Sequence, residues 1–217
     1  MNIYSDYLDR YREIAVMAVS GQLTQIPKYI SDHFPGNDAI DRDYLERQLI
    51  EAGVTVLGMG AFSICFTLPG IDHAIKLTHN KRDRWSIYAK YAMENHESNP
   101  MLPKVYGIFE HDGWCVSRME LLQDAYIDLS VGMQDVVKAV RSPVFSVMNL
   151  TRKRKIERIE FYLKKWFALN WFGNYSRKHL ADIVVWLAGT GSKVTIDCHG
   201  KNWMQRKSQL VLTDPIY

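Results

Sequence analysis

Two closely spaced glycines, Gly58 and Gly60, lie between two short runs of apolar and β-branched residues, 54–57 and 63–68. Such runs, bounded by glycine and proline, predict β-strands. Glycine lets the backbone approach a ligand closely and offer N–H groups to phosphate oxygens, although glycines between strands often mark only a turn. No lysine–hydroxyl pair follows and the next element is a strand, which excludes a Walker loop and a dinucleotide fingerprint. Ser63 stands where a third glycine of G-x-G-x-x-G would be.

A lysine, Lys76, lies inside the next apolar run, 73–77. Burying an ammonium without a partner is costly, so a phosphate and a carboxylate are the expected partners. Glu94 follows 18 residues later, in a predicted helix over residues 85–95, and is the candidate carboxylate. Glu97 is the alternative.

The N-terminal residues 1–53 carry apolar side chains at helical spacing. A first helix is expected to stop at Gly21, and a second is expected to be capped by Asp41 or Asp43 and to end at Gly53. This segment is predicted to be a helical extension.

Further strands are predicted over residues 104–110 and 114–120, joined by a tight turn at 111–113. Residues 125–189 again have helical spacing. Short strands are predicted at 194–197 and 210–213. The expected domains are a helical extension, a sheet domain and a reduced helical domain: residues 1–53, 54–122 and 123–217.

Composition and charge are those of an ordinary folded globule, with 27 basic and 24 acidic residues among 217. Three scattered cysteines argue against a disulfide framework and favour a reducing compartment. The apolar runs are too short to span a bilayer, and the N-terminus lacks a signal-peptide pattern. Residues 151–165 are strongly basic. A solvated helix face is the favoured interpretation, with phosphate or nucleic-acid binding as the alternative.

A group of polar residues near the C-terminus, Asp197, His199 and Asn202, forms the pattern D-x-H-x-x-N. A further aspartate, Asp214, comes 17 residues after Asp197. An aspartate can orient a hydroxyl and accept its proton. Asn202 and Asp214 offer hard oxygen ligands suited to Mg²⁺. The adjacent Cys198–His199 pair has no second metal-ligand pair at zinc spacing, so a zinc site is not expected.

On these motifs the sequence resembles protein-kinase-like phosphotransferases, and more closely the early serine/threonine protein kinases of short-tailed T-odd bacteriophages. The segments that carry the resemblance are LGMGAFS, HAIKL, MLPKVYGIFEHDGWCV, IDCHGKNWM and TDP. The resemblance implies an α+β, reduced two-lobed fold. Its parts would be a five-stranded antiparallel N-lobe, a helical C-lobe and a helical N-terminal extension.

The resemblance also implies roles for individual residues in binding ATP. Met119 would lie at the back of the adenine pocket, and the backbone from Glu120 to Leu122 would hydrogen-bond adenine. The residues expected around the phosphates and at the ion pair that supports them are Gly58, Gly60, Ser63, Lys76 and Glu94.

For the chemistry, the resemblance makes Asp197 the catalytic aspartate and assigns Mg²⁺ to Asn202 and Asp214. His199 stands where many protein kinases have a lysine, and it is expected to stabilise the transferring phosphoryl group. Thr195 and Ile196 replace the usual His-Arg before the aspartate. Regulation through an arginine that reads a phosphorylated loop is therefore not expected.

The expected function is ATP- and Mg²⁺-dependent phosphorylation of serine and threonine in host proteins, and of the kinase itself, during phage takeover and shutoff of host transcription. By resemblance, RNA polymerase and RNA-processing enzymes are the suspected substrates, in the host cytoplasm; neither nucleic acid nor a membrane is an expected partner. One alternative is a pseudokinase that binds host proteins. Another is a small-molecule phosphotransferase of the aminoglycoside-kinase type.

Overall fold

The computed structural model describes residues 3–34, 41–60, 63–79, 84–125, 154, 157, 174–189, 202–207 and 209–213. The chain forms two compact units, the first from residues 1–93 and 104–121 and the second from residues 94–103 and 122–217. Helices and an antiparallel five-stranded sheet are both present, which confirms the expected α+β class.

Three helices begin the first unit: α1 (Ile3–Val19), α2 (Ile26–His33) and α3 (Arg42–Glu51). As predicted, α1 ends just before Gly21, whose φ is 77°. The Asp41 side chain accepts a hydrogen bond from the Tyr44 backbone N–H at 3.1 Å, so Asp41 rather than Asp43 caps α3. Gly53, with a φ of 84°, follows the end of α3 and reverses the chain into the first strand.

Five antiparallel strands follow in the order β1-β2-β3-β5-β4. Strands β1, β2 and β3 are Thr55–Met59, Ser63–Thr67 and His73–His79. Strand β4 is Val105–His111, and strand β5 is Trp114–Glu120. Helix α4 (Trp85–Asn95) lies between β3 and β4 in the sequence. The β4–β5 turn has positive φ at Asp112 and Gly113, 44° and 85°, which matches the tight two-residue turn expected there.

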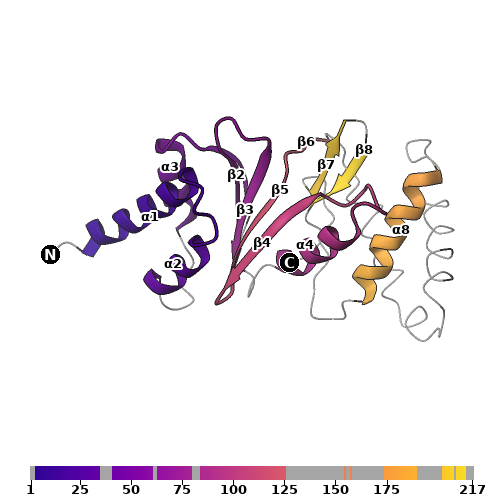
Figure 1. The fold of residues 1–217 in the computed structure, drawn as a ribbon, viewed down its shortest axis with the longest axis horizontal. Helices are drawn as coiled ribbons and strands as arrows, with labels where there is room; N and C mark the ends of the chain where they lie inside the picture. The colour runs from indigo at the N-terminus through magenta and orange to yellow at the C-terminus, as the bar shows by residue number, and fades with distance from the viewer. Residues whose placement is uncertain are drawn as a thin grey trace. The chain divides into compact units, whose positions relative to one another are not determined.

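Alternating residues give the sheet two faces, and helices lie on both sides of it (Figure 1). One face packs against α1, α2 and α3 in a single apolar cluster to which the sheet contributes Ile64, Phe66, Ile75, Leu77 and Val116. The opposite face carries Lys76 and Ser117, which are directly paired across β3 and β5, and it receives Trp85 of α4.

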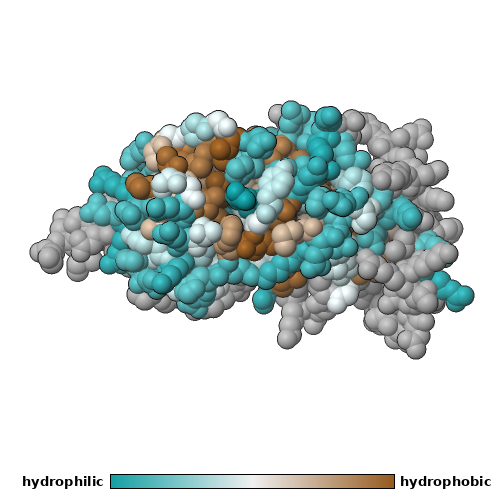
Figure 2. Space-filling model, in the orientation of Figure 1, coloured by the Kyte–Doolittle hydropathy of each residue, from teal (hydrophilic) through white to brown (hydrophobic). Residues whose placement is uncertain are grey.

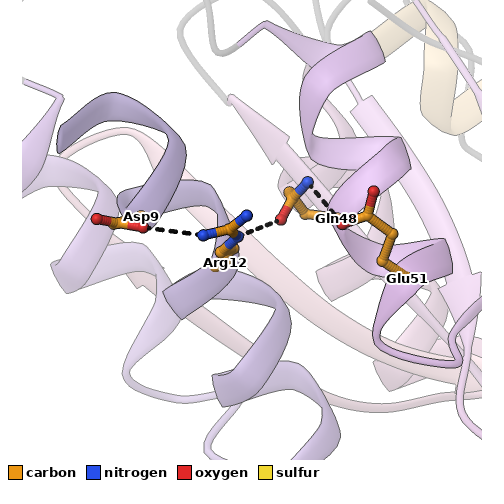
Figure 3. Close-up of polar contacts among 4 residues, drawn as sticks. All are labelled: Asp9, Arg12, Gln48 and Glu51. Atoms are coloured by element: carbon orange, nitrogen blue, oxygen red, sulfur yellow. Dashed lines mark hydrogen bonds and ion pairs between the residues drawn. The ribbon is translucent and has the colours of Figure 1, made fainter. Parts of the chain in front are cut away.

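Polar contacts join α1 to α3 beside this apolar cluster (Figure 3). The Arg12 Nε donates to Gln48 Oε1 at 3.2 Å, and Gln48 Nε2 donates to Glu51 Oε2 at 3.0 Å. Arg12 also pairs with Asp9 at 3.2 Å. Helices α1 and α3 are therefore connected to one another as well as packed on the sheet.

Strand β1 lies at one edge of the sheet and exposes apolar side chains. On the face seen in Figure 2, hydrophobic residues reach the surface among hydrophilic ones. Ile50 of α3 and Leu57 and Met59 of β1 are 56%, 44% and 41% exposed. The strand therefore adds little to the core of this unit.

The second unit contains α8 (Asn174–Gly189) and a small antiparallel sheet in the order β6-β7-β8. The strands are Gln123–Asp124, Trp203–Arg206 and Gln209–Leu212. Strand β8 confirms the strand expected at 210–213, shifted by one residue, whereas the one expected at 194–197 lies outside the described residues. Of the helical region expected over 125–189, the described residues are Ala125, which follows β6 and is not helical, residues 154 and 157, and α8.

The segment before β4 is held within the second unit by side-chain and backbone hydrogen bonds. The Asn99 Nδ2 donates to the His179 carbonyl of α8 at 2.9 Å, and Arg206 donates to the carbonyls of Pro100 and Leu102 at 3.0 and 3.1 Å. Within the part of the chain that the structure describes, no helix is long and apolar enough to cross a membrane.

Candidate functional site

The candidate site centres on Lys76, in the middle of β3 and of the sheet. This lysine is only 6% exposed. Its cross-strand neighbours are Cys65 on β2 and Ser117 on β5, so its side chain leaves the sheet on the side of α4. The Lys76 Nζ lies 4.3 Å from the centre of the Trp85 ring. A cation at this distance from an indole face is attracted by the ring quadrupole.

The ring of Trp85 is itself fixed by Ser117. The Trp85 Nε1–H donates to Ser117 Oγ at 2.8 Å, and the Ser117 hydroxyl donates weakly to the Lys76 carbonyl at 3.5 Å. All three residues are buried. Sequence reasoning missed Trp85 and Ser117, because no local pattern shows which residues a non-sequential strand pairing brings beside a lysine.

Met119 and Glu120, which are among the residues expected around adenine, lie at the end of β5. Met119 pairs with Ala74 on the same face as Lys76, and both are buried. Glu120 is also buried, its backbone N–H donates to the Lys104 carbonyl at 2.9 Å, and its Oε1 accepts the Lys104 N–H at 2.7 Å. The backbone N–H of Glu120 is therefore already used in a hydrogen bond within the protein. Contacts of adenine with the backbone from Glu120 to Leu122 stay a prediction.

The two glycines take different positions in the β1–β2 turn. Gly58 follows an irregularity in the pairing of β1 with β2, and a Cβ added there would meet nothing within 4 Å. The Gly60 N–H donates to the Ser63 carbonyl at 2.8 Å, and a Cβ on Gly60 would come within 2.9 Å of Ser63 Oγ. Arg42 of α3 donates to the Gly60 carbonyl. The residues between Gly60 and Ser63 lie outside the described part.

The two candidate carboxylates for Lys76 lie at and just after the end of α4. Glu94 is in the last turn of α4, Glu97 follows the helix, and both are exposed. The chain passes from the first unit to the second between Met93 and Glu94. An ion pair of Lys76 with either glutamate stays a prediction.

The second unit contains Asn202, immediately before β7. Asn202 is buried, and its carbonyl accepts hydrogen bonds from the Thr213 N–H at 2.8 Å and from Thr213 Oγ1 at 3.0 Å. The β7–β8 hairpin thus places Asn202, just before β7, beside Thr213, just after β8. Asp214 follows Thr213 in the sequence, and Asp197, His199 and Asp214 all lie outside the described residues.

No cluster of three or more histidine, cysteine, aspartate or glutamate residues that could hold a metal occurs within the described ranges. Of the two residues expected to bind Mg²⁺, only Asn202 falls in those ranges. Comparison with known proteins gives no matching family model, and no curated protein has a significant match to the chain.

Proposed function

We propose that this protein is an ATP- and Mg²⁺-dependent phosphotransferase with a reduced, two-lobed protein-kinase-like fold. The observation that carries the proposal is the buried Lys76 at the centre of the sheet. It follows a strand–glycine turn–strand unit and precedes helix α4. In protein kinases a glycine-rich loop covers the phosphates of ATP, and a lysine on the third strand contacts them.

A buried ammonium in the middle of a sheet has no structural advantage over an apolar side chain. Replacing buried charges with well-packed apolar residues is often neutral or stabilising. The other face of the same strand shows this preference, because Ile75 and Leu77 fill it. An anionic ligand would give the lysine on the α4 face a role in function, and nucleotide phosphates fit that chemistry.

Within this proposal, Gly58, Gly60 and Ser63 cover the phosphates and Lys76 contacts them. The second unit supplies the chemistry: Asn202 and Asp214 hold Mg²⁺, Asp197 orients the accepting hydroxyl, and His199 stabilises the phosphoryl group. The β7–β8 hairpin supports the pairing of Asn202 with Asp214, because it holds Thr213 against Asn202.

The proposed substrates are serine and threonine hydroxyls of bacterial host proteins, and of the kinase itself. RNA polymerase and RNA-processing enzymes are proposed targets on the strength of the sequence resemblance alone. The setting proposed on the same basis is the cytoplasm of an infected bacterium.

Thermal unfolding with and without Mg²⁺–ATP tests nucleotide binding, because a ligand that binds only the folded state raises the melting temperature. The wild-type protein should show the rise and Lys76→Met should not. Lys90→Met is the matched control, since Lys90 is on α4, is exposed and pairs with Glu110. A wild-type protein without a rise at millimolar nucleotide would overturn the proposal.

Transfer is tested by labelling with γ-phosphate-labelled ATP, alone and with a host lysate. Asp197→Asn should keep the thermal response but lose transfer by a factor on the order of 10²–10⁴. Wild-type binding without transfer would favour the pseudokinase instead. Transfer only to small aminoglycoside-like molecules would favour the small-molecule phosphotransferase.

A further inference from the structure

We infer that Trp85 is a positioning residue for the phosphate-binding lysine: its indole face holds the Lys76 ammonium where nucleotide phosphates are bound. The inference rests on the proposed function and names a residue that the resemblance does not supply. The ammonium nitrogen lies 4.3 Å from the ring centre, inside the roughly 6 Å range of cation–π attraction.

Burial makes this contact stronger than a surface one. Trp85 is 0% exposed and Lys76 is 6% exposed. Tryptophan is the best aromatic partner for a cation, and the attraction rises when both groups are removed from water. The ring can therefore offset part of the cost of keeping an ammonium inside the unit.

The ring cannot turn freely away from the lysine. Trp85 is the first residue of α4, and its Nε1–H is bound to Ser117 Oγ at 2.8 Å. Ser117 is the direct cross-strand partner of Lys76. Tyr88, one turn further along α4, packs against the indole with ring centres 5.9 Å apart. The sheet that carries the lysine thus also sets the orientation of the ring.

The indole attracts the ammonium through its quadrupole and carries no net charge. Trp85 therefore orients the positive charge without adding a charge of its own to the proposed phosphate site.

The test replaces Trp85 site-specifically with mono-, di- and trifluorotryptophan in the full-length protein. Fluorine withdraws electron density from the ring face while nearly preserving its volume, so a role through packing volume alone would be unaffected. We expect the apparent Kd for Mg²⁺–ATP, measured by calorimetry, to rise with each fluorine and to reach about 5- to 30-fold, the range of a buried cation–π contact. The melting temperature without nucleotide should fall along the series as well, because the ring also offsets part of the cost of burying the ammonium.

The same fluorinated series at Trp114 is the control. Trp114 packs with the apolar cluster on the other face of the sheet and contacts His79. Fluorination of Trp114 should leave the Kd for Mg²⁺–ATP unchanged within about twofold. Trp85→Phe, which keeps an aromatic face, should bind better than Trp85→Leu, which keeps only apolar volume.

Two failures are distinguishable. If the wild-type protein binds Mg²⁺–ATP and the Kd stays flat across the Trp85 series, the positioning role is wrong and the proposed function stands. If the wild-type protein does not bind Mg²⁺–ATP, the proposed function is wrong and the positioning role fails with it.

Discussion

The two faces of the five-stranded sheet are made by alternating residues of the same strands, yet they are buried in different ways. One face meets α1, α2 and α3 through isoleucine, leucine, phenylalanine and valine side chains. The other places Lys76, Thr78 and Ser117 out of water, at 6%, 0% and 0% exposure. Neighbours in sequence such as Ile75 and Lys76 therefore lie in opposite chemical environments.

The difference separates residues that stabilise the fold from residues that are candidates for function. Apolar burial on the face that packs against α1, α2 and α3 contributes stability in proportion to the area removed from water. Buried polar groups require partners, as Trp85 and Ser117 provide for one another. Substitutions on the face that packs against α1, α2 and α3 should thus change only the free energy of unfolding. Substitutions on the α4 face should also change the affinity for the ligand.

The largest effect on stability is expected from Ile75→Ala on the apolar face. Ile75 is fully buried, and removing its methyl and methylene groups leaves a cavity that should lower the free energy of unfolding by about 2–5 kcal/mol. Chemical denaturation measures this loss. The Kd for Mg²⁺–ATP of the folded variant should stay within about twofold of wild type; loss of binding would show that the two faces are not separable.

Ser117→Ala, on the polar face, should have the next largest effect. It removes the acceptor of the Trp85 Nε1–H in a fully buried setting, which should cost about 1–3 kcal/mol of unfolding free energy. It should also weaken Mg²⁺–ATP binding measurably, because the indole loses its anchor. Denaturation and calorimetry on the same sample check both; a stability loss with unchanged Kd would place Ser117 with the purely structural residues.

Asp41→Ala tests the helix layer that covers the apolar face. Loss of the α3 cap should lower the unfolding free energy by about 1 kcal/mol, within a range of roughly 0.5–2. Asp43→Ala is the comparison variant, since Asp43 lies in the first turn of α3 without being its cap. Equal losses from both substitutions, measured by thermal denaturation, would contradict the capping role of Asp41.

The smallest effect is expected for the ion pair between Lys90 and Glu110, which joins α4 to β4. The two side chains are 52% and 36% exposed, and water and salt screen such pairs. A double-mutant cycle with both alanine variants should give a coupling free energy of about 0–1 kcal/mol that decreases in high salt. A coupling well above that range would mean that the α4 side of the sheet depends on surface charge.

Local signals allowed much of the fold to be predicted from sequence. Helix α4 and strand β5 were expected with the bounds that the structure shows, and the tight Asp112–Gly113 turn sets the start of β5. Strands β6 and β7 were not expected. They are two and four residues long and largely polar, so they lack an alternating apolar pattern.

The candidate site was less accessible to sequence reasoning. The glycine turn and Lys76 carry a local pattern, but the insertion of β5 between β3 and β4 does not. That insertion brings Ser117 beside Lys76, and Trp85 joins them from the start of α4. A tryptophan at the start of a helix has the same appearance in sequence whether it packs on leucines or on an ammonium.

The interior position of β5, between β3 and β4, has a consequence for folding during synthesis. Nascent chains fold from the N-terminus during synthesis at about 5–20 residues per second. The apolar faces of α1, α2 and α3 are complete early, yet their sheet partner Val116 belongs to the last strand of the unit. About 100 residues separate the end of α1 from the end of β5, so on the order of 5–20 seconds pass between them. During that interval the chain lacks part of the sheet that covers its apolar helix faces, and chaperones that bind exposed apolar surface should improve its yield.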